Sequence, residues 1–168
     1  MNVEVIQVPV EEKQTLNNLL KMYCYEWSQY NKFDVNDKGE YEFEHHLPKF
    51  WNKENHYPFF IKVNGILAGF VLIDDEFQIY KNSDYSVSKF FVMHKYRKAG
   101  VGRYAAKAVF DMFHGKWEIE RHPNNIASVI FWDRIINEYM DGKYEIIKSC
   151  PDVVYNDGTC GDIISFEN

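Results

Sequence analysis

Two β-rich runs joined by an Asn-Gly pair place the strongest constraint on the fold of this 168-residue chain. The runs cover residues 57–63 and 66–73, and Asn64-Gly65 lies between them. Asn-Gly is the dipeptide most typical of a two-residue type I′ turn, because both central residues of that turn need a positive φ. The pattern therefore predicts an antiparallel β-hairpin.

Helical periodicity is found on both sides of this hairpin. Apolar residues spaced three and four apart form one stripe in each of three segments, as in amphipathic helices. The first stripe consists of Leu16, Leu19, Leu20, Tyr23, Trp27 and Tyr30, and the second of Val101, Ala105, Ala108 and Met112, with Gly115 as the expected C-terminal stop. The third helix is predicted over residues 125–137, with Ala127, Ile130, Phe131 and Ile135 facing inward. A brief helix or turn containing Pro48 is expected over residues 44–51.

Further strands are predicted where short apolar or alternating runs occur. These runs are residues 3–8, 85–93, 117–121, 144–147 and 163–166. The order of strands and helices predicts an α/β (α+β) fold, in which a mixed sheet carries helices on its faces. The chain contains no linker, internal repeat or low-complexity tract, so we expect one domain over residues 1–168.

Composition narrows the classes of function. The net charge of −6 argues against a general nucleic-acid binder, which needs a basic surface to neutralise phosphates. No apolar run approaches the roughly 18 residues of a membrane span. Cys24, Cys150 and Cys160 are an odd number, and no Cys or Cys/His spacing is typical of a zinc site. We therefore expect a cytoplasmic protein with reduced thiols, no metal, and neither a membrane nor a nucleic acid as partner.

The segment from Phe90 to Arg103 joins a predicted buried strand to the second helix. A helix begins with backbone N–H groups that lack internal partners and with the positive end of its dipole, and glycines let a ligand approach the backbone. Such a segment suits a phosphate or pyrophosphate. The Walker pattern fails because Gly102 is followed by Arg103-Tyr104, and the dinucleotide fingerprint fails because only Gly100 and Gly102 could serve.

This segment resembles the pyrophosphate loop of the GNAT superfamily of acyl-CoA N-acyltransferases. That loop follows a Val at the end of the fourth strand and reads Arg or Gln, two residues, Gly, any residue, and Gly or Ala. Val92 and the run Arg97-Lys98-Ala99-Gly100-Val101-Gly102 meet this pattern. A plain helix-capping glycine turn is the alternative interpretation.

A second stretch is similar to the same family. Its members carry a fifth strand ending in an acidic residue, then an Asn, then a helix with an aromatic residue about seven positions later. Glu120, Asn125 and Trp132 follow this spacing. Asn124 competes with Asn125, because it would place Phe131 at the aromatic position.

The resemblance implies a GNAT-like, mostly antiparallel sheet with splayed fourth and fifth strands, between which acetyl-CoA lies as the acyl donor. The pyrophosphate would meet the N–H groups from Arg97 to Arg103. Val92 would bind the pantetheine arm through its backbone, and Asn125 and Trp132 would contact the arm from the far side.

The implied reaction is transfer of an acetyl group to a primary amine by direct attack in a ternary complex. Glu120 is the candidate base, with Asp84 as a second catalytic candidate and Glu118 behind it. Many relatives have a Tyr where Trp132 stands, and an indole cannot supply a proton as a phenol does. The general acid therefore stays open.

The acceptor and the assembly are not fixed by these residues. A small-molecule or a protein amine fits equally well, and a homodimer is compatible with the predicted edge strands. His45 and His46 could line an acceptor pocket or simply be exposed. A second functional class stays open as well, namely a non-catalytic acyl-CoA sensor or interaction module with the same fold.

Overall fold

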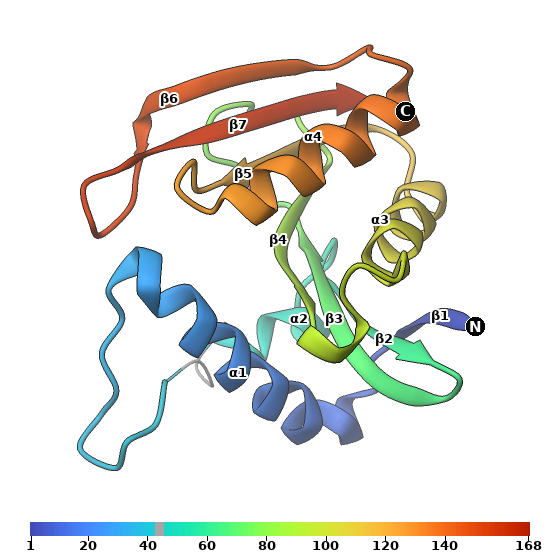
Figure 1. The fold of residues 1–168 in the computed structure, drawn as a ribbon, viewed down its shortest axis with the longest axis vertical. Coiled ribbons are helices and arrows are strands. Elements are labelled where there is room, and N and C mark those ends of the chain that lie inside the picture. The colour runs from blue at the N-terminus through green and yellow to red at the C-terminus, as the bar shows by residue number, and fades with distance from the viewer. Residues whose placement is uncertain (43–45) are drawn as a thin grey trace.

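The computed structural model describes residues 1–42 and 46–168 (Figure 1). These residues form seven strands and four α-helices. The strands are β1 (Val3–Gln7), β2 (Tyr57–Val63), β3 (Ile66–Asp74), β4 (Tyr85–Val92), β5 (Lys116–Arg121), β6 (Glu145–Val154) and β7 (Cys160–Glu167). The helices are α1 (Lys13–Asn31), α2 (Lys49–Asn52), α3 (Val101–Met112) and α4 (Ile126–Met140), and short 3-10 turns precede α1 and α3 at Val10–Glu12 and His94–Tyr96.

The strands form one sheet in the order β1-β2-β3-β4-β5-β7-β6. Every neighbouring pair is antiparallel except β4 and β5, which run parallel. The mixed, mostly antiparallel α/β fold predicted from the sequence is thus confirmed. In Figure 1 the sheet divides at this pair, with β1 to β4 in one half and β5, β7 and β6 in the other.

Helices cover both faces of the sheet. α3 and α4 pack on one face through a core that includes Val101, Phe110, Trp117, Trp132 and Ile136. On the opposite face, α1 and α2 cover the β2–β4 part through a second core that includes Leu16, Leu20, Phe60, Phe70 and Phe91. A small third cluster packs the loop after β3 onto the β6–β7 hairpin. We call the face of the sheet that α1 and α2 cover the α1 face.

The predicted hairpin is confirmed, with Asn64 and Gly65 at φ 50° and 77°. The inward faces predicted for two helices were partly wrong. Met112 and Ile130 are 47% and 63% exposed, whereas Trp132 and Ile136 are buried in α4. Ile135 is buried as predicted, whereas Ala127 is exposed, so the buried residues of α4 are Trp132, Ile135 and Ile136.

Gly115 does not stop α3, whose C-cap is the extended Phe113. Position 115 requires a glycine for another reason, because a Cβ there would lie 2.5 Å from Oδ2 of Asp84. Of the predicted segment 44–51, Glu44 and His45 lie outside the described residues, and α2 forms its end. The last two strands are longer than predicted, since β6 continues through two register shifts. Among the described residues, no helix combines the length and hydropathy that a bilayer crossing requires.

Candidate active site

The central feature of the site is the gap between β4 and β5. The two strands pair only through Tyr85 with Trp117 and Ser86 with Glu118. Directly afterwards the register between β3 and β4 shifts, with Leu72 opposite Lys89 and Ile73 opposite Val87. The extra residue is a β-bulge, which bends and twists the strand that carries it. β4 therefore leaves β5 along the rest of its length.

The end of β4 presents backbone groups to this gap. Met93 donates its N–H to the carbonyl of Ala68 on β3 at 2.8 Å. Backbone groups of successive residues in a strand point to alternate sides, so the N–H and C=O of Val92 point away from β3. The Val92 carbonyl already accepts Nε of Arg97 at 2.6 Å, while its side chain is buried.

The loop after β4 ends at the N-terminus of α3. Lys98 and Gly100 have φ of 61° and 83°, and Gly100 is the N-cap of the helix. The first backbone bond of the helix runs from the N–H of Tyr104 to the carbonyl of Gly100, and no side chain caps the helix. The N–H groups of Val101, Gly102 and Arg103 therefore have no intrahelical partner, and they can receive an anion.

The side chain of Arg97 connects this loop to α1. Its Nη2 lies 2.6 Å from Oε2 of Glu26, and Nε2 of His94 lies 2.8 Å from Oε1 of the same carboxylate. Together with the bond to Val92, these contacts direct the guanidinium toward α1. Arg97 thus holds the loop in place through its side chain and leaves only its backbone for a ligand.

The remaining loop residues are exposed or paired. Lys98 and Ala99 are exposed, whereas the side chain of Val101 is fully buried in the core beneath α3. Nε of Arg103 lies 2.9 Å from Oε2 of Glu138 on α4. The loop therefore presents exposed basic side chains, such as Lys98 and Arg103, beside the backbone N–H groups at the start of α3.

Of two adjacent aromatic residues on α4, Phe131 is half-buried and Trp132 is buried, and both rings pack against Phe90 of β4, that of Trp132 with centroids 5.2 Å apart. A Cβ on Gly102 would lie 3.1 Å from the Phe131 ring, and that ring packs against Phe90 of β4 with centroids 5.3 Å apart. Trp132 is only 5% exposed and belongs to the core. Asn125 is the N-cap of α4, and its Oδ1 accepts the N–H of Ser128 at 3.2 Å.

Glu120 lies on the β5 side of the gap and on the α1 face. It pairs across the sheet with Ile163 of β7. Its charge acts on Lys89 of β4, whose pKa is lowered by burial and partly restored by nearby carboxylates, and on Tyr155, whose pKa is raised. Glu120 is half-buried, so its carboxylate is available to a molecule entering the gap.

Glu118, two residues earlier, is 1% exposed and holds a loop. Its Oε1 accepts the N–H of Gln78 at 2.6 Å, and its Oε2 accepts the N–H groups of Ile79 at 3.2 Å and Tyr80 at 2.7 Å. With both oxygens occupied by backbone donors, this carboxylate binds the β3–β4 loop to β5.

Asp84 lies at the other end of β4 from the loop that precedes α3. Its N–H donates to the Lys116 carbonyl at 2.7 Å, and its Oδ2 accepts the Lys116 N–H at 2.8 Å. Glu120 is four residues along β5 from Lys116, or roughly 13 Å at strand rise. The structure therefore does not bring Asp84 and Glu120 together.

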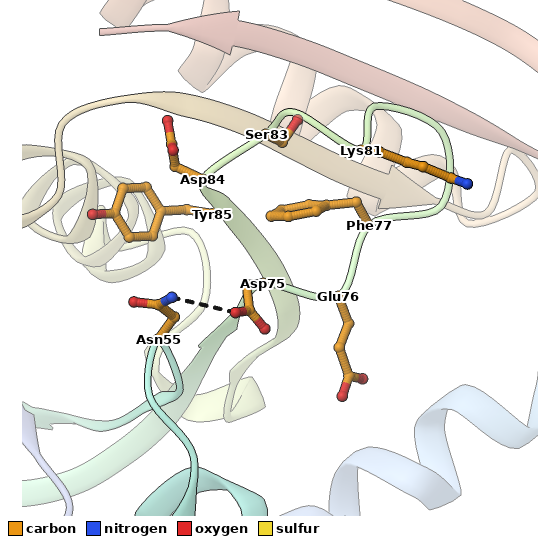
Figure 2. Close-up of a pocket in the computed structure, with 8 residues that line it drawn as sticks. All are labelled: Asn55, Asp75, Glu76, Phe77, Lys81, Ser83, Asp84 and Tyr85. Carbon is orange, nitrogen blue, oxygen red and sulfur yellow. Dashed lines mark hydrogen bonds between the residues drawn. The ribbon is translucent and has the colours of Figure 1, made fainter.

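Asp84 instead lines a separate pocket of about 600 Å³ (Figure 2). Its other lining residues are Asn55, Asp75, Glu76, Phe77, Lys81, Ser83 and Tyr85, and Nδ2 of Asn55 donates to Asp75 at 3.3 Å. His46, one of the two histidines considered for the acceptor pocket, is exposed, and His45 falls outside the described part of the chain.

Sequence reasoning missed the aromatic and polar residues around Glu120. Trp27, Tyr30, His122 and Tyr155 form a cluster in which ring centroids lie 4.5–5.9 Å apart. Trp27 and Tyr30 belong to the helical stripe of α1 that the sequence predicted. Tyr155 lies in a polar turn with no periodicity, and its proximity to Glu120 follows only from the pairing of β7 with β5.

Comparison with known proteins agrees with this geometry. No curated protein sequence matches the chain, whereas the model of the acetyltransferase (GNAT) family matches residues 18–136. An acetyltransferase from Thermus thermophilus is similar in fold, with a TM-score of 0.69 at 10% identity over 100% of this chain and 98% of that one.

Two further solved structures share the fold. The ribosomal-protein-S18-alanine N-acetyltransferase from Escherichia coli has a TM-score of 0.60 at 14% identity, covering 99% of this chain and 94% of that one. A ribosomal L7/L12 alpha-N-protein acetyltransferase in complex with coenzyme A has a TM-score of 0.69 at 12% identity, with the same coverage of both chains. The family match spans most of the chain, which therefore belongs to the acetyltransferase (GNAT) family and is an acyltransferase.

Proposed function

We propose that this protein transfers an acetyl group from acetyl-CoA to a primary amine, by direct attack of the amine within a ternary complex. One observation carries the proposal, namely the gap between β4 and β5, which has the uncapped N-terminus of α3 at its open end and Glu120 on its wall. Both the donor and the base that the reaction needs thus have a place along one opening.

The donor fits the gap through backbone groups. The N–H groups at the start of α3, with those of Arg97, Lys98 and Ala99 before it, receive the pyrophosphate. Gly102 lets α4 pack closely against this helix start, because a Cβ there would lie 3.1 Å from the Phe131 ring. The pantetheine arm runs along β4 past Val92, whose N–H points into the gap, and Phe131 contacts it from the opposite side. Asn125, the N-cap of α4, is proposed to contact the arm from the same side.

Glu120 is the base in this proposal. It takes a proton from the attacking amine, whose lone pair forms the C–N bond with the thioester carbonyl carbon. The tetrahedral intermediate then collapses, the C–S bond breaks, and coenzyme A leaves as the thiolate, which solvent protonates. Trp132 has no part in the step, because it is buried behind Phe131. Asp84 lies too far along the sheet to act on the same amine.

The acceptor enters from the α1 face, where Glu120 is half-buried. Small-molecule and protein amines both remain candidates, and we expect the reaction to take place in the cytoplasm without a metal ion. Entry of the acceptor through the pocket beside Asp84 has no support, since that pocket lies at the paired end of β4 and β5.

The test is turnover of acetyl-CoA against a panel of primary amines by parent protein and by Glu120→Gln. The amide keeps the shape of the side chain but does not accept the proton. We expect kcat to fall by about 10²–10⁴, the usual contribution of a general base, while acetyl-CoA binding is retained. Undiminished turnover by Glu120→Gln would exclude Glu120 as the base. Binding of acetyl-CoA with no turnover by the parent on any amine would favour a sensor.

A further inference from the structure

The second half of α1 contacts the loop between β4 and α3 through the carboxylate of Glu26. Its Oε2 lies 2.6 Å from Nη2 of Arg97, and its Oε1 lies 2.8 Å from Nε2 of His94. In Figure 1 the segment after β4 accordingly turns beside α1 before α3 begins. The side chain of Glu26 is 28% exposed, so these pairs are screened less than pairs at the open surface. Glu26 therefore joins α1 to the loop that is proposed to bind the pyrophosphate.

The contacts among Glu26, His94 and Arg97 form a closed set. Nη1 of Arg97 lies 3.3 Å from Nδ1 of His94, and Nε of Arg97 donates to the Val92 carbonyl at 2.6 Å. Because a guanidinium can only donate, Nδ1 of His94 accepts, and its Nε2–H donates to Glu26. The guanidinium also lies over the Phe91 ring, 5.8 Å from the ring centroid. Each of the three nitrogens of Arg97 thus has a different partner, which fixes the orientation of the side chain.

The part of α1 that carries Glu26 is held in place by the core. Tyr23 lies three residues before Glu26, and its ring packs edge-on against Phe70 and Phe91 with centroids 6.0 and 6.3 Å apart. Cys24 is buried beside it in sequence. Residues three apart on a helix are neighbours on its surface, so the side chain of Glu26 extends from a well-packed turn of α1. The carboxylate thus offers Arg97 a fixed partner.

The loop needs such support because its backbone is strained directly after Arg97. Lys98 has a φ of 61°, a left-handed conformation that a residue with a Cβ keeps only where its surroundings enforce it. Gly100 follows with a φ of 83° and is the N-cap of α3. Because the Arg97 side chain is held at three points, the residue from which this turn starts is fixed. The direction of the N–H groups at the start of α3 is fixed with it.

The charge of Glu26 alone would act against binding of the coenzyme. The carboxylate neutralises the guanidinium of Arg97, and a negative charge beside the loop repels a pyrophosphate. Electrostatics therefore predicts that removal of this charge tightens binding, and release of Arg97 toward the ligand would have the same effect. A positioning role predicts the opposite sign, because the loop loses the contacts that hold its conformation.

We propose that Glu26 is a positioning residue for the acyl donor, whose carboxylate fixes Arg97 and His94 so that the loop directs its N–H groups toward the pyrophosphate of acetyl-CoA. This inference rests on the proposed binding of acetyl-CoA at the start of α3. Glu26 itself contacts neither the donor nor the reacting atoms. It acts before binding, because it keeps the free loop in the conformation that the ligand needs and so lowers the cost of ordering it.

The test is the Kd for acetyl-CoA, measured by isothermal titration calorimetry in the parent, Glu26→Gln and Glu40→Gln. Glu40→Gln is the matched control, because it breaks another ion pair of α1, with Lys21 at 2.9 Å, that does not involve the loop. For Glu26→Gln we expect Kd to rise about threefold to thirtyfold, between the effect of an exposed ion pair and that of a hydrogen bond to a charged group. Glu40→Gln should bind within about twofold of the parent. An unchanged or lower Kd in Glu26→Gln, or an equal rise in both variants, would overturn the inference.

Turnover gives a second readout. A residue that acts only on binding of the donor should raise the KM for acetyl-CoA in Glu26→Gln and leave kcat within about twofold of the parent. A fall in kcat at an unchanged KM would show that Glu26 acts on the chemical step and would contradict the positioning role.

The double variant asks whether Glu26 acts through Arg97. Arg97→Gln breaks the same pair from the other side, so it should raise Kd alone, and Glu26→Gln should then add less than about twofold. Losses that multiply in full would show that Glu26 acts independently of Arg97 and would overturn the inference. Absence of acetyl-CoA binding by the parent would instead refute the proposed function, whatever the variants do.

Discussion

Replacing Glu118 by Gln tests whether the β3–β4 loop is held by one buried carboxylate. In the parent, both oxygens accept backbone N–H groups, from Gln78 at 2.6 Å, Ile79 at 3.2 Å and Tyr80 at 2.7 Å. A Gln amide retains one accepting oxygen and turns an NH₂ group toward the donors on the other side. At least one backbone N–H is then left buried without a partner, which costs about 1–3 kcal/mol.

The lost charge adds to this cost, because the remaining bonds are no longer charge-assisted. The sum is about 2–4 kcal/mol in the free energy of unfolding. For a domain of this size, each kcal/mol lowers the melting temperature by roughly 2–4 °C. We therefore expect Glu118→Gln to melt about 5–15 °C below the parent, as measured by circular dichroism.

Glu120→Gln is the matched control for this substitution. It makes the same chemical change two residues away on the same face of β5, at a half-buried side chain that holds no such loop. We expect its melting temperature to change by less than about 3 °C. A Glu118→Gln protein that melts within about 2 °C of the parent would refute the reasoning. If Glu120→Gln melts close to the parent, its loss of activity cannot be ascribed to unfolding.

Three further outcomes follow from the packing and the pKa shifts. Trp132→Ala should cost about 3–5 kcal/mol in urea unfolding, whereas Phe131→Ala should cost less and weaken acetyl-CoA binding in calorimetry; the reverse order would place Trp132 at the gap. Gly69→Ala should destabilise by about 3 kcal/mol or more, because its Cβ would overlap the backbone oxygen of Phe91 on β4, and an unchanged urea midpoint would contradict this close approach of the two strands. In the folded state the pKa values of Tyr23 and Tyr155 are raised above the ordinary 10.0, so their contribution to stability is complete below pH 10 and is lost as pH rises. These two tyrosines should gain phenolate absorbance only when the protein unfolds at alkaline pH. Titration of all twelve tyrosines near pH 10 would refute this expectation.

The strands and helices could be predicted from local patterns. The hairpin around Asn64-Gly65 follows from the positive φ that its turn requires, and the loop before α3 follows from the order of strand, glycines and helix. The helix faces were harder to predict. In α4, Phe131 and Trp132 are equally apolar, and only the gap on one side and the core on the other decide which is buried.

The polar part of the site depends on pairing between distant strands. Glu118 and Glu120 have the same residue type on the same strand, but one accepts hydrogen bonds from the loop at residues 78–80 and the other lies opposite Ile163 of β7. Similarly, Arg97 fits the family motif by type, while its partner Glu26 lies 71 positions earlier on α1. No local pattern encodes such contacts, because they arise from how the elements stack.

The central claim is that acetyl-CoA binds at the gap, against the start of α3. Its most direct test is thermal unfolding with and without acetyl-CoA, in the parent, Gly100→Glu and Gly39→Glu. The two glycines have similar φ, 83° and 73°, and open space around an added Cβ, so both variants carry the same backbone strain and charge. At about one hundred times Kd, the ligand should add roughly 2.7 kcal/mol, a rise of about 5–10 °C. This rise is expected in the parent and Gly39→Glu and should be lost in folded Gly100→Glu, whereas no rise in the parent, or an equal rise in all three, would contradict binding of acetyl-CoA at the start of α3.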